Sequence, residues 1–377
     1  MIYLDYAATS PMSKSAIDTY VEVANSYFGN TASLHDEGGK AQALIQEARK
    51  IIARKLGVNE DGILFTGSGT EGNILAILSL ARASNKGKHI ITSIAEHTSV
   101  HAAMNTLELE GYEITRLNFT EKGIIDLEQL KANIRTDTAL ISIQHVNSEI
   151  GSIQPVEQIA HIAKENNIRY HVDCVQSFCK LSLLSFAKLV DGITVSAHKI
   201  GGPKGCGAIY LNPSLLVKPL FPGVTHERGL RGGTLDTPAI AAMAMAVEKF
   251  EYSIHDQNQL RNQFKEALDT DICTWVEADL PHQLPSICGL YIKGVEGQLI
   301  LLKLNESGIC ISTGSACDIN SASGTKAILA MNYSLNEARS FFRVSFGSTT
   351  TNEEIEQVAN RLNKIMAEEN MRKAPFT

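Results

Sequence analysis

GILFTGSGTEGNILAILSLARA, residues 62–83, decides the fold class. Its first part, Gly62–Thr66, is a short apolar run typical of a buried strand, and Thr70–Ala83 has the apolar spacing of a helix. The intervening GSG lets the backbone turn sharply and approach a ligand closely. A buried strand followed directly by a helix predicts one unit of a parallel sheet that is covered by helices.

The same alternation continues toward the C-terminus. We therefore expect an α/β fold, with a mostly parallel sheet covered by helices and ligands at the carboxyl ends of its strands. The other expected strands are His89–Ile94, Tyr112–Leu117, Ala139–Gln144, Arg169–Val172, Gly192–Ser196 and Gly207–Leu211. The other expected helices are Thr98–Glu110, Val156–Asn166 and Pro238–Tyr252.

The pattern changes after about Tyr252 and predicts a second, smaller α+β domain of about 120 residues. We place the large domain at residues 15–255 and the small domain at residues 1–14 and 256–377, with a mobile loop at about 313–331. Strands are expected at Ser286–Ile292, Ile309–Ser312 and Phe342–Phe346, and helices at His255–Asp269, Gly297–Glu306 and Asn352–Glu368.

Composition narrows the class of protein. Of the 377 residues, 44% belong to the set AVILMFWYC and 20% are charged, which argues against disorder and coiled coil. Lys plus Arg number 34 against 41 for Asp plus Glu, a net charge of −7, so a small molecule is a better partner than nucleic acid or an anionic membrane. We see no secretory signal and no apolar run of roughly 20 residues, and expect a soluble, cytoplasmic protein.

Seven cysteines are scattered without a CxxC pair or a zinc-type spacing. This pattern argues for reduced thiols, and we expect no metal site. Because a buried cysteine is usually a small apolar core residue, that role is the default for each of the seven.

Polar residues follow several of the expected strands. His97 follows one strand, Asn147 the next, and Asp173 comes directly after Arg169–Val172, with Gln176 three positions on. Each residue alone would more often cap a turn or a helix. Together they indicate a site, because neighbouring parallel strands deliver these groups to the same edge of the sheet.

The segment SAHKIGGPKG, residues 196–205, is the most informative about chemistry. Pyridoxal phosphate needs a lysine for covalent attachment, an acid at the pyridine nitrogen and a cradle for its phosphate. Lys199, Asp173 and the loop at Gly69 and Thr70 could supply them in that order. The alternative, a solvated lysine on a loop, leaves the neighbouring Ser, His and glycines unexplained.

Nine blocks in order carry a close resemblance to a known family. They are YLDYAATSPM, FGNTASLHDEG, FTGSGTEGN, AEHTSV, HVNSEIGSIQPV, HVDCVQS, SAHKIGGPKG, LRGGTLDTP and STGSAC. In these blocks the sequence resembles the cysteine desulfurases, pyridoxal-phosphate enzymes of the class-V aminotransferase family with the aspartate-aminotransferase fold type. The resemblance covers nearly the whole chain.

The resemblance implies a cofactor site in a homodimer. Lys199 would bond to the cofactor, Asp173 would hold the pyridine nitrogen protonated, and His97 would stack on the ring and shuttle protons. Gln176 would hydrogen-bond the ring hydroxyl. The residues implied to bind the phosphate are Gly69, Thr70, Ser196, His198 and the partner subunit's Thr234. Asn147 and Arg343 would hold the substrate carboxylate, and Asn147 would also contact the cofactor.

Cys317 is the exception among the cysteines, because it lies in the small, polar stretch SACDINSASG. An exposed thiol can form the nucleophilic thiolate. The resemblance implies that Cys317 takes sulfur from L-cysteine as a persulfide, leaving L-alanine, and that its long loop passes the sulfur to acceptor proteins. These would serve iron–sulfur cluster, thio-tRNA or cofactor biosynthesis. The sequence departs from the family at Gly201, where an aromatic residue is frequent, and at Lys326, where histidine is usual.

Two alternatives remain open at this point. One keeps the fold and changes the substrate, as in a selenocysteine lyase or another pyridoxal-phosphate lyase or transaminase, and a long polar loop with Cys317 disfavours it. The other is a catalytically idle relative that binds a partner as a scaffold. The intact set of Lys199, Asp173, His97 and Cys317 disfavours that hypothesis.

Overall fold

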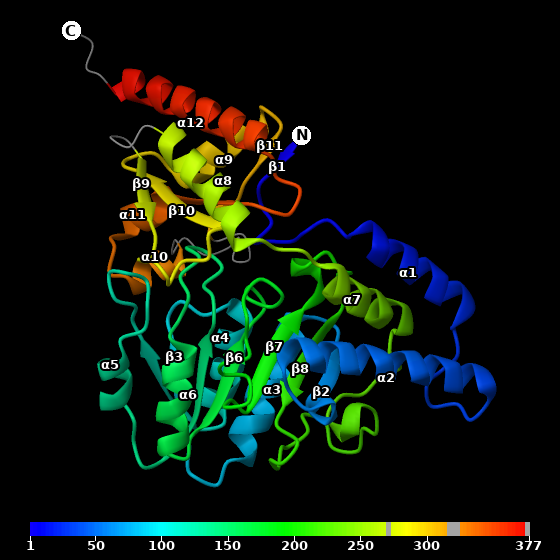
Figure 1. Cartoon of the computed structure of the whole chain (residues 1–377). Helices are drawn as coiled ribbons and strands as arrows, with labels where there is room; N and C mark the ends of the chain where they lie inside the picture. Colours follow the sequence, from blue (N-terminus) through cyan, green and yellow to red (C-terminus); the bar gives the residue numbers. More distant parts are fainter. Residues whose placement is uncertain (269–272, 315–324, 374–377) are drawn as a thin grey trace.

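Figure 1 shows the chain as a computed structural model, in which residues 1–268, 273–314 and 325–373 are described. A large sheet with its helices fills the lower part of the view. The helices α8 (Ile254–Ala267), α9 (Gly297–Asn305) and α12 (Asn352–Lys373) lie above it. Among the described helices, none is both long and apolar enough to span a membrane.

The large sheet has seven strands in the order β2-β8-β7-β6-β5-β3-β4. Neighbouring strands from β7 through β4 run parallel, whereas β8 runs antiparallel to both β7 and β2. The predicted α/β fold with a mostly parallel sheet is therefore confirmed. The strands are β2 (Ile63–Thr66), β3 (His89–Ser93), β4 (Glu113–Leu117), β5 (Thr138–Gln144), β6 (Arg169–Asp173), β7 (Gly192–Ser196) and β8 (Gly207–Leu211).

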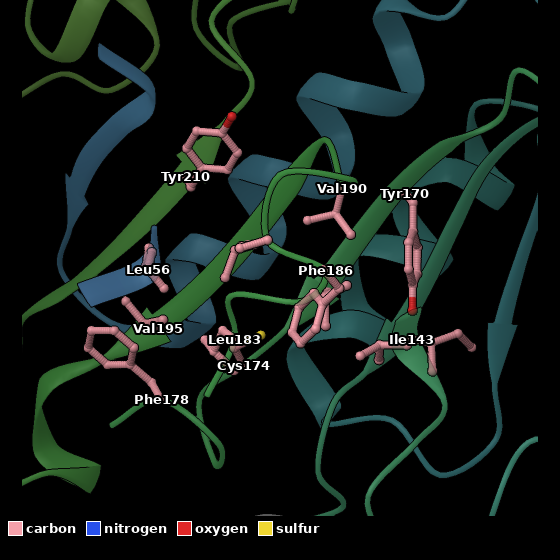
Figure 2. Packing of buried hydrophobic residues seen from close by; sticks show 14 of the residues in the cluster. Leu56, Ile143, Tyr170, Cys174, Phe178, Leu183, Phe186, Val190, Val195 and Tyr210 are labelled. Carbon is pink, nitrogen blue, oxygen red and sulfur yellow. The ribbon is translucent and has the colours of Figure 1, made fainter. Parts of the chain in front are cut away.

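Two core layers cover the two faces of this sheet, because successive side chains of a strand point to opposite sides. In β2, Leu64 packs with α3 and α4, whereas Phe65 packs in the layer with α2 and α6. Figure 2 shows this second layer, where Tyr170, Phe186 and Val190 gather on one face. The helices around the sheet are α1 (Lys14–Ser26), α2 (Asp36–Leu56), α3 (Gly69–Ala83), α4 (Thr98–Leu109), α5 (Leu127–Ala132), α6 (Val156–Glu165) and α7 (Thr237–Lys249).

A three-stranded antiparallel sheet, in the order β12-β10-β9, forms the centre of the smaller part. Its strands are β9 (Cys273–Val276), β10 (Ile287–Ile292) and β12 (Phe341–Ser345). The N-terminal strand β1 (Ile2–Tyr3) pairs with β11 (Ile309–Cys310), and Leu4 shares a core cluster with Phe342. The start of the chain therefore packs with its C-terminal part. The residue at which one domain passes into the other stays a prediction.

One part of the predicted loop at 313–331 is wrong. The structure forms the helix α10 (Lys326–Ala330) there, followed by α11 (Leu335–Ser340). The physical reason is that Ala327, Ile328 and Ala330 are buried, so this stretch packs into the core that covers the large sheet.

Candidate active site

A cavity of about 420 Å³ opens at the carboxyl ends of the parallel strands, and β12 and α10 complete its lining. This volume is in the range of small-molecule sites, roughly 300–1,000 Å³. The cavity collects most of the predicted site residues. Those that line it are Gly69, Thr70, His97, Asp173, Gln176, Ser196, His198, Lys199 and Arg343.

Lys199 lies in the short 3₁₀ turn Ala197–Lys199, which follows β7 without a break. Its Nζ donates hydrogen bonds to the carbonyl oxygens of Ala7 (2.5 Å) and Ala8 (2.7 Å). The N-terminal block YLDYAATSPM therefore contributes backbone acceptors to the cavity. Gly201 is also tied to this block, because its N–H donates to Ser10 Oγ at 2.8 Å.

Asp173 is the last residue of β6, and its side chain is almost fully buried. One oxygen, Oδ1, accepts a hydrogen bond from the Val175 N–H at 2.9 Å, and Oδ2 accepts one from Asn73 Nδ2 at 2.7 Å. Two donors from different elements thus fix the carboxylate at the end of the strand. A carboxylate held in this way suits a protonated ring nitrogen.

His97 is the N-cap residue of α4, and its Nδ1 lies 2.7 Å from Ser99 Oγ. Burial lowers the pKa of His97 below its ordinary value, because removing water disfavours the charged imidazolium. The cations Lys199 and Lys326 lower that pKa as well, while Asp173 acts in the opposite sense. His97 is therefore neutral at neutral pH.

The N-terminus of α3 reaches the same cavity. Ser68 caps this helix, accepting a hydrogen bond from the Glu71 N–H at 3.1 Å, and the first-turn amides of Gly69 and Thr70 are at the cavity. A Cβ added to Gly69 would lie 3.0 Å from Val175 Cγ2 and 3.3 Å from Ser196 Cβ, so only glycine packs here without displacement. The start of a helix of this length is an anion site.

Several buried polar atoms around the cavity have no hydrogen-bond partner among the described residues, which is unusual for native proteins. They are Ser196 Oγ, Gln176 Oε1, Asn73 Oδ1 and Arg343 Nε. A phosphorylated pyridine with a ring hydroxyl would supply hydrogen-bond donors and acceptors for these atoms, and Lys199 would supply the amine that bonds to it. The residues present therefore fit pyridoxal phosphate.

Arg343 on β12 brings a cation to the cavity. Its two terminal nitrogens donate to the Ser148 carbonyl oxygen (2.7 Å) and to Asp5 Oδ1 (2.8 Å), whereas Nε has no hydrogen-bond partner among the described residues. Asp5 is held beside β12 by a bridge to Ser345. The guanidinium is thus oriented by the protein before any carboxylate ligand binds.

Three predicted site residues are not part of this lining. Asn147 is buried just behind it: its Oδ1 accepts from the backbone N–H groups of Glu149 and Ile150, and its Nδ2 donates to the Ala95 carbonyl oxygen. The structure thus uses Asn147 to shape the loop after β5, and its predicted cofactor and substrate contacts are not seen in this lining. Thr234 is exposed and away from the cavity of its own chain, and Cys317 lies outside the described residues.

The structure also adds residues that sequence analysis missed. Glu96 and Glu149 line the cavity, and burial raises the pKa of Glu96 to about 8 and that of Glu149 to about 7. Glu149 Oε2 accepts a hydrogen bond from the Ala327 N–H at 2.7 Å, at the start of α10, and Lys326 lines the cavity beside it. Glu96 and Glu149 both lie within the sequence blocks that carry the family resemblance, close to predicted site residues. They were not predicted as site residues because an acid after a strand usually caps a turn or a helix.

The other six cysteines are free and fit the predicted core role well. Cys174, Cys206, Cys273 and Cys288 are buried, and Cys179 and Cys310 are partly buried. Burial raises the pKa of Cys288 to about 11 and of Cys206 to about 12, so these thiols do not ionise at neutral pH.

Comparison with known proteins gives one consistent result. The model of the aminotransferase class-V family matches residues 2–358. The putative cysteine desulfurase NifS of Bacillus subtilis strain 168 is 40% identical over 366 residues, which cover 95% of this chain and 93% of that protein. The cysteine desulfurase IscS of Dictyoglomus turgidum is 37% identical over 371 residues, covering 97% and 94%.

Solved structures agree with these relatives. A NifS-like protein superimposes with a TM-score of 0.89 and 29% identity, covering 97% of this chain and 99% of that chain. A structure described as SspA in complex with cysteine gives a TM-score of 0.81 and 34% identity, covering 92% and 99%.

Proposed function

The chain belongs to the aminotransferase class-V family, and within it to the cysteine desulfurases, and from this premise we propose that it converts L-cysteine to L-alanine and passes the sulfur to Cys317. The observation that carries the proposal is the convergence of Lys199, Asp173 and His97 on one cavity that the α3 N-terminus also reaches. A transaminase would need no nucleophilic thiol, and an idle scaffold would need none of these groups.

Pyridoxal phosphate supplies, when bound, an electron sink that stabilises negative charge on the substrate. Lys199 would attach it and Asp173 would hold its ring nitrogen. Gln176, whose Nε2 donates to the Ala7 carbonyl oxygen at 2.8 Å, keeps Oε1 for the ring hydroxyl. The residues that would hold the phosphate are Gly69, Thr70, Ser196 and His198, together with the partner subunit's Thr234.

Arg343 would bind the carboxylate of L-cysteine through its unused Nε and the terminal nitrogen now held by Asp5. A guanidinium suits this role because its fork matches a carboxylate in two hydrogen bonds. Arg343 is almost fully buried, and a charged interaction is stronger in a buried environment than in water. Lys199 Nζ, beside the carbonyl oxygens of Ala7 and Ala8, lies in the same cavity and, as a neutral amine, would take a proton from bound substrate.

Cys317 would act as the nucleophile. Its thiolate attacks the substrate sulfur, the carbon–sulfur bond breaks, and the electron pair stays on the carbon, which takes up a proton as the methyl group of alanine. A sulfur–sulfur bond remains on Cys317 as the persulfide. Gly314 lines the cavity and Cys317 follows three residues later, a reach of about 10 Å of extended chain.

We further propose a cytoplasmic homodimer that donates sulfur to an acceptor protein. Thr234 is exposed in its own chain, as a residue that completes the partner's site would be. Ile17 and Val21 on α1 and Phe28 just after it have apolar side chains that are about half or more exposed, and burial of such side chains would favour a dimer. Acceptors for iron–sulfur cluster, thio-tRNA or cofactor biosynthesis are the candidates.

The test is a pair of cysteine variants assayed with L-cysteine, L-selenocysteine and keto acids. We expect Cys317→Ala to bind pyridoxal phosphate and L-cysteine with unchanged visible spectra but to release almost no sulfide, and the wild type to gain the mass of one sulfur atom on Cys317. Cys310→Ala, at a partly buried thiol, is the control and should stay active. Full activity of Cys317→Ala would remove that residue from the mechanism.

A further inference from the structure

A chain of hydrogen bonds links Asp173 to His97 inside the cavity. Asn73 Nδ2 lies 2.7 Å from Asp173 Oδ2 and 3.0 Å from Ser99 Oγ. Ser99 Oγ lies 2.7 Å from His97 Nδ1, and the Ser99 backbone N–H reaches the same nitrogen at 3.2 Å. Asn73 and Ser99 are almost fully buried, so water does not compete for these bonds.

The direction of the chain is set at Asn73. An ionised carboxylate only accepts hydrogen bonds, so the atom of Asn73 that meets Asp173 must be the amide nitrogen. This nitrogen has two hydrogens, one for Asp173 and one for Ser99 Oγ. The amide oxygen is left without a partner among the described residues, which is the cost of placing both hydrogens inward.

The same reasoning continues to the imidazole. Because Ser99 Oγ accepts from Asn73, its own hydrogen is free to be donated, and His97 Nδ1 is the neighbour at 2.7 Å. The Ser99 backbone N–H can only donate, and it too is directed at Nδ1. Both bonds require a lone pair on Nδ1, so the single proton of the neutral ring sits on Nε2.

We propose that Asn73 and Ser99 are positioning residues, which couple Asp173 to His97 and hold His97 as the neutral imidazole with its proton on Nε2. These hydrogen bonds are formed by residues of this protein alone. The role of the hydrogen bonds in catalytic turnover rests on the proposed function.

The neighbours of His97 favour the same state. Its charged and titratable neighbours are Asp173, Lys199, Lys326, His101 and His198. Burial lowers the pKa of His101 and of His198 to about 4, so both are neutral near pH 7 and add no charge. Within the described part of the chain, the two lysines disfavour a second proton on His97, whereas Asp173 favours it.

The consequence concerns the role of His97. A ring that already carries its proton on Nε2 donates a hydrogen bond there and does not remove a proton from substrate. Triosephosphate isomerase uses a neutral histidine in this manner. Proton removal then falls to Lys199, while His97 orients and polarises the bound group. For His97 to take up a second proton, Nδ1 would have to lose its hydrogen bonds from the Ser99 hydroxyl and the Ser99 backbone N–H.

The experiment is nitrogen NMR of the full-length holoenzyme labelled with ¹⁵N-histidine, repeated without cofactor. The signals of His97 are identified by their loss in His97→Gln. We expect an unprotonated Nδ1 and a protonated Nε2 throughout neutral pH. In Ser99→Ala the hydroxyl donor is lost, so we expect a mixture of tautomers and a His97 pKa higher by about one unit, a tenfold change in proton affinity. Asn73→Ala should change the tautomer mixture and the pKa of His97 in the same direction as Ser99→Ala does.

Controls separate positioning from general damage. Ser79→Ala removes another buried hydroxyl from the helix that carries Asn73, one without a partner in the described chain, and should leave His97 unchanged. Ser99→Thr keeps the hydroxyl and should retain the wild-type tautomer.

A protonated Nδ1 in the wild type would overturn the inference even if neither Ser99→Ala nor Asn73→Ala folds, and so would unchanged signals in a folded Ser99→Ala. Failure of the proposed function would instead appear as absence of alanine formation by the wild type, which the NMR measurement does not involve.

Discussion

The cavity has two walls that are built in different ways. One, the strand-end wall, lies at the carboxyl ends of the parallel strands of the large sheet and consists of His97, Asp173, Ser196 and Lys199. The other, the mixed-charge wall, consists of Glu149, Lys326 and Arg343, which meet where β12 and α10 approach that sheet. In the strand-end wall Ser196 Oγ has no hydrogen-bond partner among the described residues, whereas Arg343 in the mixed-charge wall, although its Nε is also unpartnered there, already has its positive charge paired with Asp5.

This difference suggests different occupants. Unpartnered atoms on a rigid sheet edge suit a group that stays bound, because the site needs no rearrangement to receive it. A cation that already has a carboxylate partner suits a charged ligand that comes and goes, because the internal carboxylate keeps the charge compensated between turnovers. We therefore assign the cofactor to the first wall and substrate recognition to the second.

The largest effect should come from the strand-end wall. Lys199→Ala removes the amine that attaches the cofactor, so we expect desulfuration to fall by a factor of about 10³ or more. The visible absorbance of the covalently held cofactor should vanish. Lys204→Ala is the matched control, an exposed lysine five positions along the same segment. If Lys204→Ala lost the absorbance and Lys199→Ala kept it, the strand-end wall would be misassigned.

A substitution in the mixed-charge wall should weaken the binding of L-cysteine. Arg343→Ala removes charged hydrogen bonds worth about 1.5–3 kcal/mol each, so we expect the KM for L-cysteine to rise between about 10- and 100-fold, with kcat less affected. The loss also leaves Asp5 without its partner, so thermal stability should fall. Asp5→Asn with Arg343→Ala should recover part of that stability. An unchanged KM would assign the substrate carboxylate to another residue.

The two walls also differ in how far sequence could foresee them. Lys199, Asp173 and His97 were predictable because each follows a strand, and parallel strands end at one edge of a sheet. Glu149 was not assigned a role, because its partner, the Ala327 N–H, is 178 positions away in sequence. Asn73 was hidden for a similar reason: it lies within an apolar helix, and only folding places Asp173 against it.

Among the helices and strands, too, some could be predicted from sequence and others could not. The strands of the large sheet were found within one or two residues, since most of them are short runs rich in apolar residues. The short strand Cys273–Val276 and the helix Lys326–Ala330 were missed, because four or five residues give no period to recognise. Both are fixed by packing against β10 or the core of the large sheet, not by their own sequence.

Glu149 offers a test by pH. Its pKa is about 7 in the folded chain against an ordinary 4.5, so between these values the folded state keeps a proton that the unfolded state has lost. The contribution of Glu149 to the free energy of unfolding is therefore fully present below pH 4.5. It falls by roughly 3 kcal/mol as the pH rises toward 7. Glu149→Gln keeps an oxygen acceptor for the Ala327 N–H and should remove this dependence.

The measurement is chemical denaturation of wild type and Glu149→Gln from pH 5 to 8. We expect the variant to gain stability relative to the wild type as pH rises. Glu157→Gln, at an exposed acid near the start of α6, should show no such trend. A constant difference between wild type and Glu149→Gln across this range would mean that Glu149 is already ionised in the folded chain.

The smallest effect should come from Lys326, which lines the mixed-charge wall but acts on the strand-end wall through its charge. Lys326 lowers the pKa of His97 and of His101, so Lys326→Ala should raise the pKa of both, His97 by a fraction of a unit. Since Arg343 remains to hold the carboxylate, we expect the KM for L-cysteine to rise only two- to threefold, the size of a partly screened charge. Lys326→Arg keeps the cation and should restore both values. Histidine titration by NMR checks the first effect and steady-state kinetics the second. A KM change as large as that of Arg343→Ala would show that Lys326 binds substrate directly, and the two walls would then share more of the recognition than their geometry indicates.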